Sequence, residues 1–166
     1  MPMLPQDIEA IAEAVIRRAE AKGLMIATAE SCTGGLVSGA LTAIAGSSAV
    51  LDRGFVTYSN EAKVEMLGVG SDLLASFGAV SESTARAMAE GAVARSRASI
   101  AVSVTGIAGP GGGSPQKPVG LVHFAAHGPN GRTVHLEKRF GDIGRDAIRL
   151  ESVRTALGLL TDAVSE

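Results

Sequence analysis

Residues 24–35, Leu24-Met25-Ile26-Ala27-Thr28-Ala29-Glu30-Ser31-Cys32-Thr33-Gly34-Gly35, predict a buried strand, a tight turn and the start of a helix. Ser31 would then stand at the carboxyl end of the strand, where ligands of α/β proteins bind because loops converge there and helix N–H groups face outward. Gly34 and Gly35 would let a ligand or another backbone segment come close to the helix start. A simpler role is also open, in which Ser31 or Thr33 only caps the helix.

Alternating apolar patterns extend this strand and helix order over the rest of the chain. We predict strands over residues 24–28, 50–58, 99–105, 119–127 and 133–140. We predict helices from Ile8 to a stop at Gly23, over residues 33–44, 60–67 and 72–77, from Ser81 or Ser83 onward, and after a capping Asp142. Gly128-Pro129-Asn130-Gly131 predicts a hairpin between the last two strands. The pattern predicts an α/β fold, a three-layer sandwich whose mixed, mostly parallel sheet has helices on both faces.

Composition limits the possible functions. The chain has 166 residues, typical of one domain spanning residues 1–166, and its net charge of −2 gives no general attraction to nucleic acid. Aromatic residues make up only 3% of the chain, so the aromatic side chains on which the bases of single-stranded nucleic acid would stack are missing. No apolar run is long enough to cross a bilayer, and one cysteine fits a reducing compartment. We therefore expect a cytoplasmic protein that binds neither nucleic acid nor membrane.

A serine nucleophile needs a base that takes its proton. His123, His127 and His135 all lie in the predicted hairpin, far from Ser31 in sequence, and we expect them to pack there. Lys63 is the better candidate, because burial can lower the pKa of a lysine enough for it to act as a base. The alternative is a solvated lysine.

Tyr58 ends the strand that precedes Lys63, and its hydroxyl could orient the lysine or relay a proton. A packed tyrosine without a catalytic role is the alternative. Cys32 is a rival nucleophile, although a small buried packing residue is its more ordinary role.

The glycine-rich residues 106–113 follow the third predicted strand. Backbone N–H groups that point the same way in such a loop can form a nest for an anion. The loop matches neither the phosphate-binding motif of nucleoside triphosphatases nor the dinucleotide-binding motif. A flexible connection without a ligand is the alternative.

Taken together, residues 29–35, 46–48, 54–63, 78–81 and 104–120 closely resemble the CinA C-terminal domain family. The resemblance implies a nicotinamide-nucleotide amidase whose catalytic group is Ser31, Tyr58 and Lys63. It also implies that Thr105 and Gly106 line the catalytic pocket. The other substrate-binding positions that we expect are Thr33, Gly34, Gly35, Gly109, Gly111 and Arg145.

The family commonly has Gly-Asp-Arg near the last helix, whereas this chain has Gly141-Asp142-Ile143-Gly144-Arg145. We match Arg145 to the family arginine and expect it to contact a substrate phosphate. The two inserted residues leave the local geometry open, and Arg149 is the other candidate.

The resemblance implies an amidohydrolase that converts nicotinamide mononucleotide to nicotinic acid mononucleotide and ammonia. It would use no cofactor and no metal, would take a small nucleotide substrate and would form a homo-oligomer. The alternative is a non-catalytic nucleotide-binding regulatory module associated with competence or the DNA damage response. Direct DNA association conflicts with the net charge and the lack of basic clusters.

Overall fold

The computed structural model describes residues 1–166, and its five strands form one sheet in the order β2-β1-β3-β4-β5. The strands are β1 (Ile26–Glu30), β2 (Leu51–Val56), β3 (Ile100–Gly106), β4 (Leu121–His127) and β5 (Thr133–Arg139). β1 pairs in parallel with β2 and β3, whereas β4 is antiparallel to both β3 and β5. Because β4 alone runs against the others, the predicted mixed, mostly parallel sheet is confirmed.

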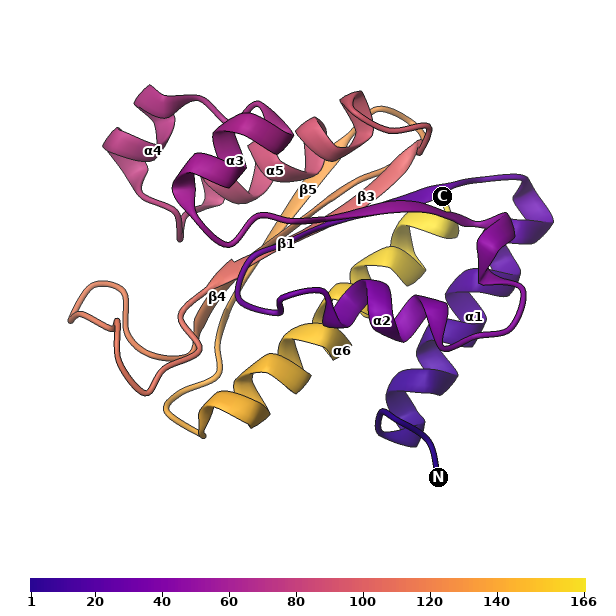
Figure 1. Ribbon diagram of the computed structural model, residues 1–166, viewed down its shortest axis with the longest axis horizontal. Helices are drawn as coiled ribbons and strands as arrows, with labels where there is room; N and C mark the ends of the chain where they lie inside the picture. The colour runs from indigo at the N-terminus through magenta and orange to yellow at the C-terminus, as the bar shows by residue number, and fades with distance from the viewer.

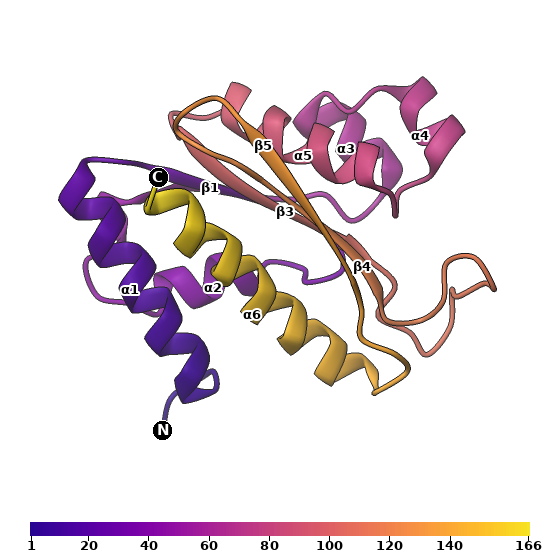
Figure 2. The same ribbon diagram turned by 180° about the vertical axis from the view of Figure 1, so that it is seen from behind.

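Helices cover both faces of this sheet, which confirms the three layers (Figures 1 and 2). They are α1 (Gln6–Lys22), α2 (Leu36–Thr42), α3 (Asn60–Leu67), α4 (Ser71–Phe77), α5 (Glu82–Ala94) and α6 (Arg145–Val164). α1, α2 and α6 lie on one face, and α3, α4 and α5 lie on the other. No helix combines the length and the apolar character that crossing a bilayer requires.

The side chains of β3 alternate between two cores. Ile100, Val102 and Val104 belong to the larger core, which α1, α2 and α6 cover. Ala101 belongs to the smaller core together with Met88 of α5. The small side chains on this second face let α5 pack closely on the sheet, as expected of a strand that is covered on both faces.

Glycines set several element boundaries. α1 ends where Gly23 adopts a left-handed φ of 66°, as predicted. The helix expected to start at residue 33 starts only at Leu36, because Gly34 (φ 57°) and Gly35 (φ 104°) interrupt the helical backbone.

The prediction that Asp142 caps the last helix is wrong. α6 begins at Arg145, and Gly144, with a φ of 100°, occupies the N-cap position without a side-chain cap. Gly141, with a φ of 82°, also bends the chain here. Asp142 is therefore exposed in a bend before the helix.

The carboxyl ends of the three neighbouring parallel strands meet at one edge of the sheet. Glu30 at the end of β1 pairs with Val56 at the end of β2 and with Val104 of β3. The segments that leave these strands carry Ser31, Tyr58 and Ile107. This edge therefore gathers the three motifs that the sequence singles out.

Candidate active site

Ser31 directly follows the last residue of the central strand β1. It is 8% exposed, and its N–H donates to the carbonyl oxygen of Val104 in β3, at 2.9 Å. Strand alternation turns Ser31 to the same face as Ala29, the face that α3 and α5 cover. The serine is thus fixed in place by paired strands on both sides of β1.

Lys63 projects into the protein from α3 and is only 1% exposed. Its Nζ lies 3.0 Å from Ser31 Oγ and donates to the carbonyl oxygens of Thr57, at 2.8 Å, and Tyr58, at 3.4 Å. No carboxylate forms an ion pair with it among the salt bridges of the structure. Burial lowers the pKa of Lys63, because a low-dielectric surrounding disfavours the ammonium form.

The start of α3 explains why Lys63 points inward. Ser59 caps the helix, and its Oγ accepts a hydrogen bond from Ala62 N–H at 3.0 Å. Gly68 ends the helix in a left-handed conformation, with a φ of 69°. Lys63 and Leu67, four residues apart, are the buried residues of α3 and so share its inner face.

Tyr58 lies at the rim of the site and does not use its hydroxyl on Lys63. The residue is 62% exposed, and its hydroxyl accepts a hydrogen bond from Arg145 Nη2 at 3.2 Å. Only its carbonyl oxygen contacts Lys63. The structure therefore pairs the tyrosine side chain with the arginine, where the sequence suggested the lysine.

Arg145 reaches the site even though two residues separate it from its expected position. It is the first residue of α6, and its Nη1 donates to Gly109 O at 2.7 Å. Together with the contact to Tyr58, this places the guanidinium between the glycine-rich loop and the loop after β2. It forms no ion pair, so its charge is free for an anionic ligand.

These side chains surround a cavity of about 190 Å³. Its lining residues are Ser31, Cys32, Tyr58, Lys63, Ala79, Val80, Thr105, Gly106, Ala108 and Arg145. The structure thus brings the three expected catalytic residues to one cavity, together with Thr105, Gly106 and Arg145 from the expected binding set.

Thr105 and Gly106 also shape the backbone around the cavity. Thr105 Oγ1 donates to Ala79 O at 2.8 Å and ties the segment before α5 to β3. A Cβ on Gly106 would lie 2.7 Å from Val122 Cγ2 and 2.8 Å from Leu121 O. Only glycine therefore fits at this end of β3.

Thr33, Gly34 and Gly35 do not line the cavity. Thr33 is fully buried, and its hydroxyl donates to Glu30 Oε1 at 2.6 Å. The two glycines adopt the left-handed backbone that bends the chain into α2. These three residues shape the turn that carries Ser31.

Several backbone N–H groups around the cavity are free of acceptors. The N–H groups of Cys32 and Thr33, after Ser31, donate to no protein group, and neither does that of Ala108. Cys32 and Ala108 also line the cavity. Such donors can stabilise an oxygen that becomes negative during acyl transfer.

Cys32 is unsuited to be the nucleophile. It is 6% exposed, and burial raises the pKa of its thiol to about 11. The negative charge of Glu30 contributes to this raised value. The thiol is therefore neutral near pH 7, which agrees with the expected packing role.

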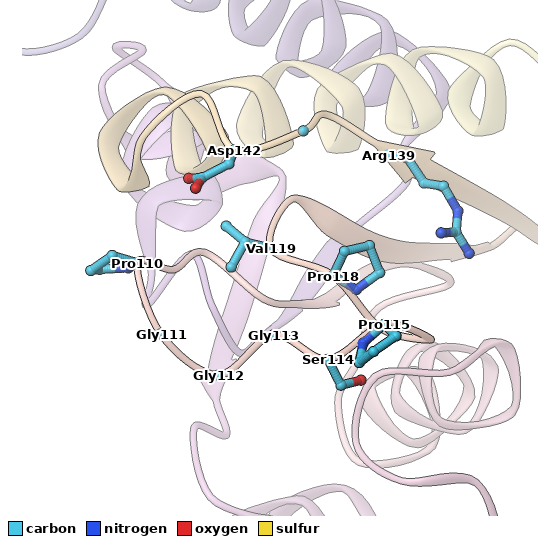
Figure 3. A pocket seen from close by; sticks show the side chains of 11 residues that line it. Pro110, Gly111, Gly112, Gly113, Ser114, Pro115, Pro118, Val119, Arg139 and Asp142 are labelled. Atoms are coloured by element: carbon cyan, nitrogen blue, oxygen red, sulfur yellow. The ribbon is translucent and has the colours of Figure 1, made fainter.

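The glycine-rich loop borders a second, wider cavity of about 640 Å³ (Figure 3). Gly111 and its neighbours form one side, and Arg139 and Asp142 contribute charged side chains. Gly109 lines neither cavity, but its carbonyl oxygen holds Arg145. Because neither Ser31 nor Lys63 lies here, the smaller cavity is the candidate active site.

The histidines lie away from Ser31, in the β4–β5 hairpin, as expected. His123 Nδ1 lies 2.9 Å from His135 Nε2, and the two rings stack with their centroids 5.2 Å apart. His127 contacts Thr133. No group of three or more His, Cys, Asp or Glu side chains is arranged to hold a metal ion.

Glu30 is the residue at this site that the sequence reasoning missed. It is completely buried at the end of β1, directly before Ser31. A charged residue that ends an otherwise uncharged strand is the signal that could have identified it. Arg149, considered from the sequence as a phosphate ligand or a solvated surface charge, contacts the carbonyl oxygens of Cys32 and Thr33 instead.

A family model described as the CinA C-terminal domain matches residues 8–164. The chain belongs to the CinA C-terminal domain family. This confirms the resemblance that the separated motifs indicated.

Known proteins similar to the chain carry competence/damage inducible, nicotinamide-nucleotide amidohydrolase or CinA-like names. The crystal structure of competence/damage inducible protein CihA from Agrobacterium tumefaciens matches with a TM-score of 0.97 and 61% identity over 100% of both chains. A nicotinamide-nucleotide amidohydrolase PncC from Enterobacter agglomerans is 53% identical over 83% of this chain and 86% of its own length. A CinA-like protein from Anaeromyxobacter sp. strain K is 51% identical over 89% of this chain. The chain spans 36% of the length of that last relative.

Proposed function

We propose that this member of the CinA C-terminal domain family is an amidohydrolase that converts nicotinamide mononucleotide to nicotinic acid mononucleotide and ammonia. The observation that carries the proposal is the buried pair of Ser31 Oγ and Lys63 Nζ, 3.0 Å apart. The name of the Enterobacter agglomerans relative supports the choice of a nicotinamide nucleotide as the substrate.

Ser31 is the nucleophile and Lys63 the base in this mechanism. The neutral Lys63 amine takes the hydroxyl proton while Ser31 Oγ attacks the carboxamide carbon. Lys63 then gives its proton to the departing amide nitrogen, which leaves as ammonia while the C–N bond breaks. The product of this half-reaction is an ester between Ser31 and the nucleotide acyl group.

Water completes the reaction. Lys63, neutral again, takes a proton from a water molecule that attacks the ester carbon, and the C–O bond to Ser31 breaks. Lys63 returns that proton to Ser31 Oγ, which releases the carboxylic acid. In both half-reactions the carbonyl oxygen becomes negative, and the free N–H groups of Cys32 and Ala108 are its candidate donors.

Arg145 is the residue that we propose binds the 5′-phosphate. Its guanidinium forms no ion pair and holds only neutral partners, Gly109 O and the Tyr58 hydroxyl. Arginine can make paired hydrogen bonds to a phosphate. Tyr58 then acts by orienting Arg145 at the rim of the site.

A non-catalytic nucleotide-binding module is the second candidate. It would need Arg145 and the glycine-rich loop, but it would have no use for a buried lysine with a lowered pKa beside a serine. The Ser31–Lys63 pair therefore favours the enzyme. A cytoplasmic location, a single domain over residues 1–166 and a homo-oligomeric assembly remain predictions from the sequence.

The test is an assay of ammonia release from nicotinamide mononucleotide, free nicotinamide and nicotinamide adenine dinucleotide. We expect the mononucleotide to give the highest kcat/KM, with nicotinic acid mononucleotide as the second product. Tight binding of the mononucleotide without any ammonia would support the binding module instead.

A further inference from the structure

Glu30 and Ser31 are neighbours in sequence that face opposite sides of the sheet. Alternation turns Ser31 toward Lys63 of α3 and Glu30 toward α2. Glu30 is 0% exposed. Its Oε1 accepts hydrogen bonds from Thr33 Oγ1 at 2.6 Å and Val37 N–H at 2.8 Å. Its Oε2 accepts one from Ser38 N–H at 3.1 Å.

These bonds replace the cap that α2 lacks. The N-cap residue is Gly35, which has no side chain to offer. Glu30 instead reaches from the end of β1 to the first N–H groups of α2, where a negative charge is favourable. Residues 31–36 therefore form a loop between Glu30, which precedes it, and the N–H groups of Val37 and Ser38, which bind the Glu30 carboxylate after it.

Arg149 of α6 holds the same loop by its carbonyl groups. Its Nε donates to Cys32 O at 3.1 Å, and its Nη2 donates to Thr33 O at 3.3 Å. It forms no ion pair with a carboxylate. A Cβ on Gly34 would lie 3.4 Å from Nη2, an ordinary van der Waals distance, so the guanidinium lies directly against this turn.

The two peptide groups that accept hydrogen bonds from Arg149 lie directly after Ser31, the proposed nucleophile. The peptide whose oxygen is Cys32 O carries the free N–H of Thr33. The peptide whose oxygen is Thr33 O carries the N–H of Gly34, which donates to Ser31 O at 3.0 Å. A cation on a peptide oxygen polarises the N–H of the same peptide and strengthens what that N–H donates to.

We propose that Glu30 and Arg149 are positioning residues that clamp residues 31–35 between a carboxylate and a guanidinium, and so fix Ser31 Oγ against Lys63. The proposal rests on the amidohydrolase function argued above. In this proposal Arg149 holds residues 31–35 in place, and Arg145 binds the substrate phosphate. The clamp matters because a shift of about 1 Å at a reacting group costs on the order of a hundredfold in rate.

The test compares Arg149→Met with Arg149→Lys and with a matched control, Arg154→Met. Met keeps most of the apolar stem and removes the charge, and Lys keeps the charge with a single donor group. Arg154 is also on α6, but it pairs with Asp7 and Glu151, which lie outside the cavity lining. Steady-state rates are measured on nicotinamide mononucleotide and on its riboside, and backbone hydrogen exchange is followed in peptides that cover residues 31–38.

We expect Arg149→Met to lower kcat on the nucleotide about ten- to a hundredfold while KM changes less than about threefold. The riboside rate should fall by the same factor, and Arg149→Lys should recover part of it. Hydrogen exchange should become faster in residues 31–38 and stay unchanged in β3 and β4. Arg154→Met should match the wild type in both readouts. Glu30→Gln, which weakens the carboxylate acceptors, should reproduce the faster exchange.

Three results would overturn the proposal. One is wild-type kcat and wild-type exchange in Arg149→Met. Another is a raised KM for the nucleotide alone, which would make Arg149 a phosphate ligand. The last is faster exchange throughout the protein, which would make the contact a general structural one. If the wild type releases no ammonia, the proposed function fails, and the exchange of residues 31–38 still decides whether the clamp exists.

Discussion

Lys63 is a buried lysine that no carboxylate compensates, and its neighbours are a serine and two carbonyl groups. Its lowered pKa means that the neutral amine is reached at a lower pH than for a solvated lysine. Because the neutral amine is the active form of a base, kcat/KM should rise with pH through this lowered pKa and then level off. A pH–rate profile checks this, with the rise expected below the ordinary value of 10.5.

Lys63→Arg separates a base from a fixed charge. Arginine keeps the positive charge but stays protonated, so we expect a loss of kcat nearly as large as in Lys63→Ala, about a hundredfold or more. Lys22→Arg is the matched control, because Lys22 is exposed on α1. Near-normal activity in Lys63→Arg would mean that another group takes the proton.

Cys32 offers a clear contrast with Ser31. With its thiol pKa raised to about 11, the group should react slowly with iodoacetamide at pH 8 and faster only as the pH approaches that value. Cys32→Ala should keep most of the activity, because it removes a small packing residue. Activity that disappears in Cys32→Ala but survives in Ser31→Ala would reverse the assignment of the nucleophile.

Arg145→Ala should weaken binding of the substrate phosphate. A lost charged hydrogen bond costs about 1.5–3 kcal/mol, so KM for the mononucleotide should rise about ten- to a hundredfold, with a smaller change in kcat. The phosphate-free riboside should be barely affected. Arg139→Ala, in the wider cavity, is the control. Equal losses on nucleotide and riboside would show that Arg145 supports the site in another way.

The sequence proposed Ser31 and Lys63 as candidates, and the structure places them 3.0 Å apart, but the sequence did not indicate the direction of the Tyr58 side chain. Ser31 follows from a local signal, the end of a strand, whereas the residues alone left a solvated Lys63 open and the resemblance to the CinA C-terminal domain family favoured it as the base. The partner of the Tyr58 hydroxyl is Arg145, which lies 87 residues later in the chain. Contacts of this kind depend on how distant elements dock, and no local pattern contains them.

At the scale of elements, the β4–β5 hairpin packs a histidine pair against the start of α5. His123 and His135 face Glu82 of α5 and Glu137 of β5. Arg86 pairs with Glu82, and Lys117 adds positive charge near His123. Burial, and then the positive charge of His135 when it is protonated, lower the pKa of His123.

This shift predicts a pH dependence of stability. The folded state favours neutral His123, whereas the unfolded chain binds its proton as pH falls through the ordinary value of 6.5. The contribution to stability is therefore complete above that pH and is lost as pH falls below it. We expect Tm to fall between pH 7.5 and pH 5.5, taken as roughly one unit to either side of that value, and to fall less in His123→Gln. His127→Gln is the control, and an equal fall in both variants would contradict the assignment.

Element types could be predicted from periodicity, whereas several boundaries could not. β3 alternates large and small side chains as expected, since its two faces meet different cores. α2 and α6 start later in the chain than expected, because Gly35 and Gly144 adopt positive φ angles. A glycine in the sequence permits such angles without requiring them, so a pattern alone places the cap at the nearest acidic residue, as it did for Asp142.

At the scale of the whole molecule, the site depends on the strand order. Ser31 follows β1, Lys63 follows β2 and Gly106 ends β3, and these three strands are adjacent in the sheet. α6 then returns from the far end of the chain and brings Arg145 and Arg149 to the same edge. Strand order is not encoded in hydrophobic periodicity, so the resemblance of the separated motifs to one family gave the only indication from sequence that they converge.

The role of Ser31 as the nucleophile of an amidohydrolase is tested most directly by the rate of ammonia release from nicotinamide mononucleotide, measured for the wild type and for Ser31→Ala. We expect the wild type to release ammonia steadily, with stoichiometric nicotinic acid mononucleotide. We expect Ser31→Ala to lose about a thousandfold or more of this rate with an unchanged Tm, since the variant removes only the nucleophile from a site that is already formed. A wild type that releases no ammonia, or a Ser31→Ala variant that releases it at the wild-type rate, would contradict the central claim.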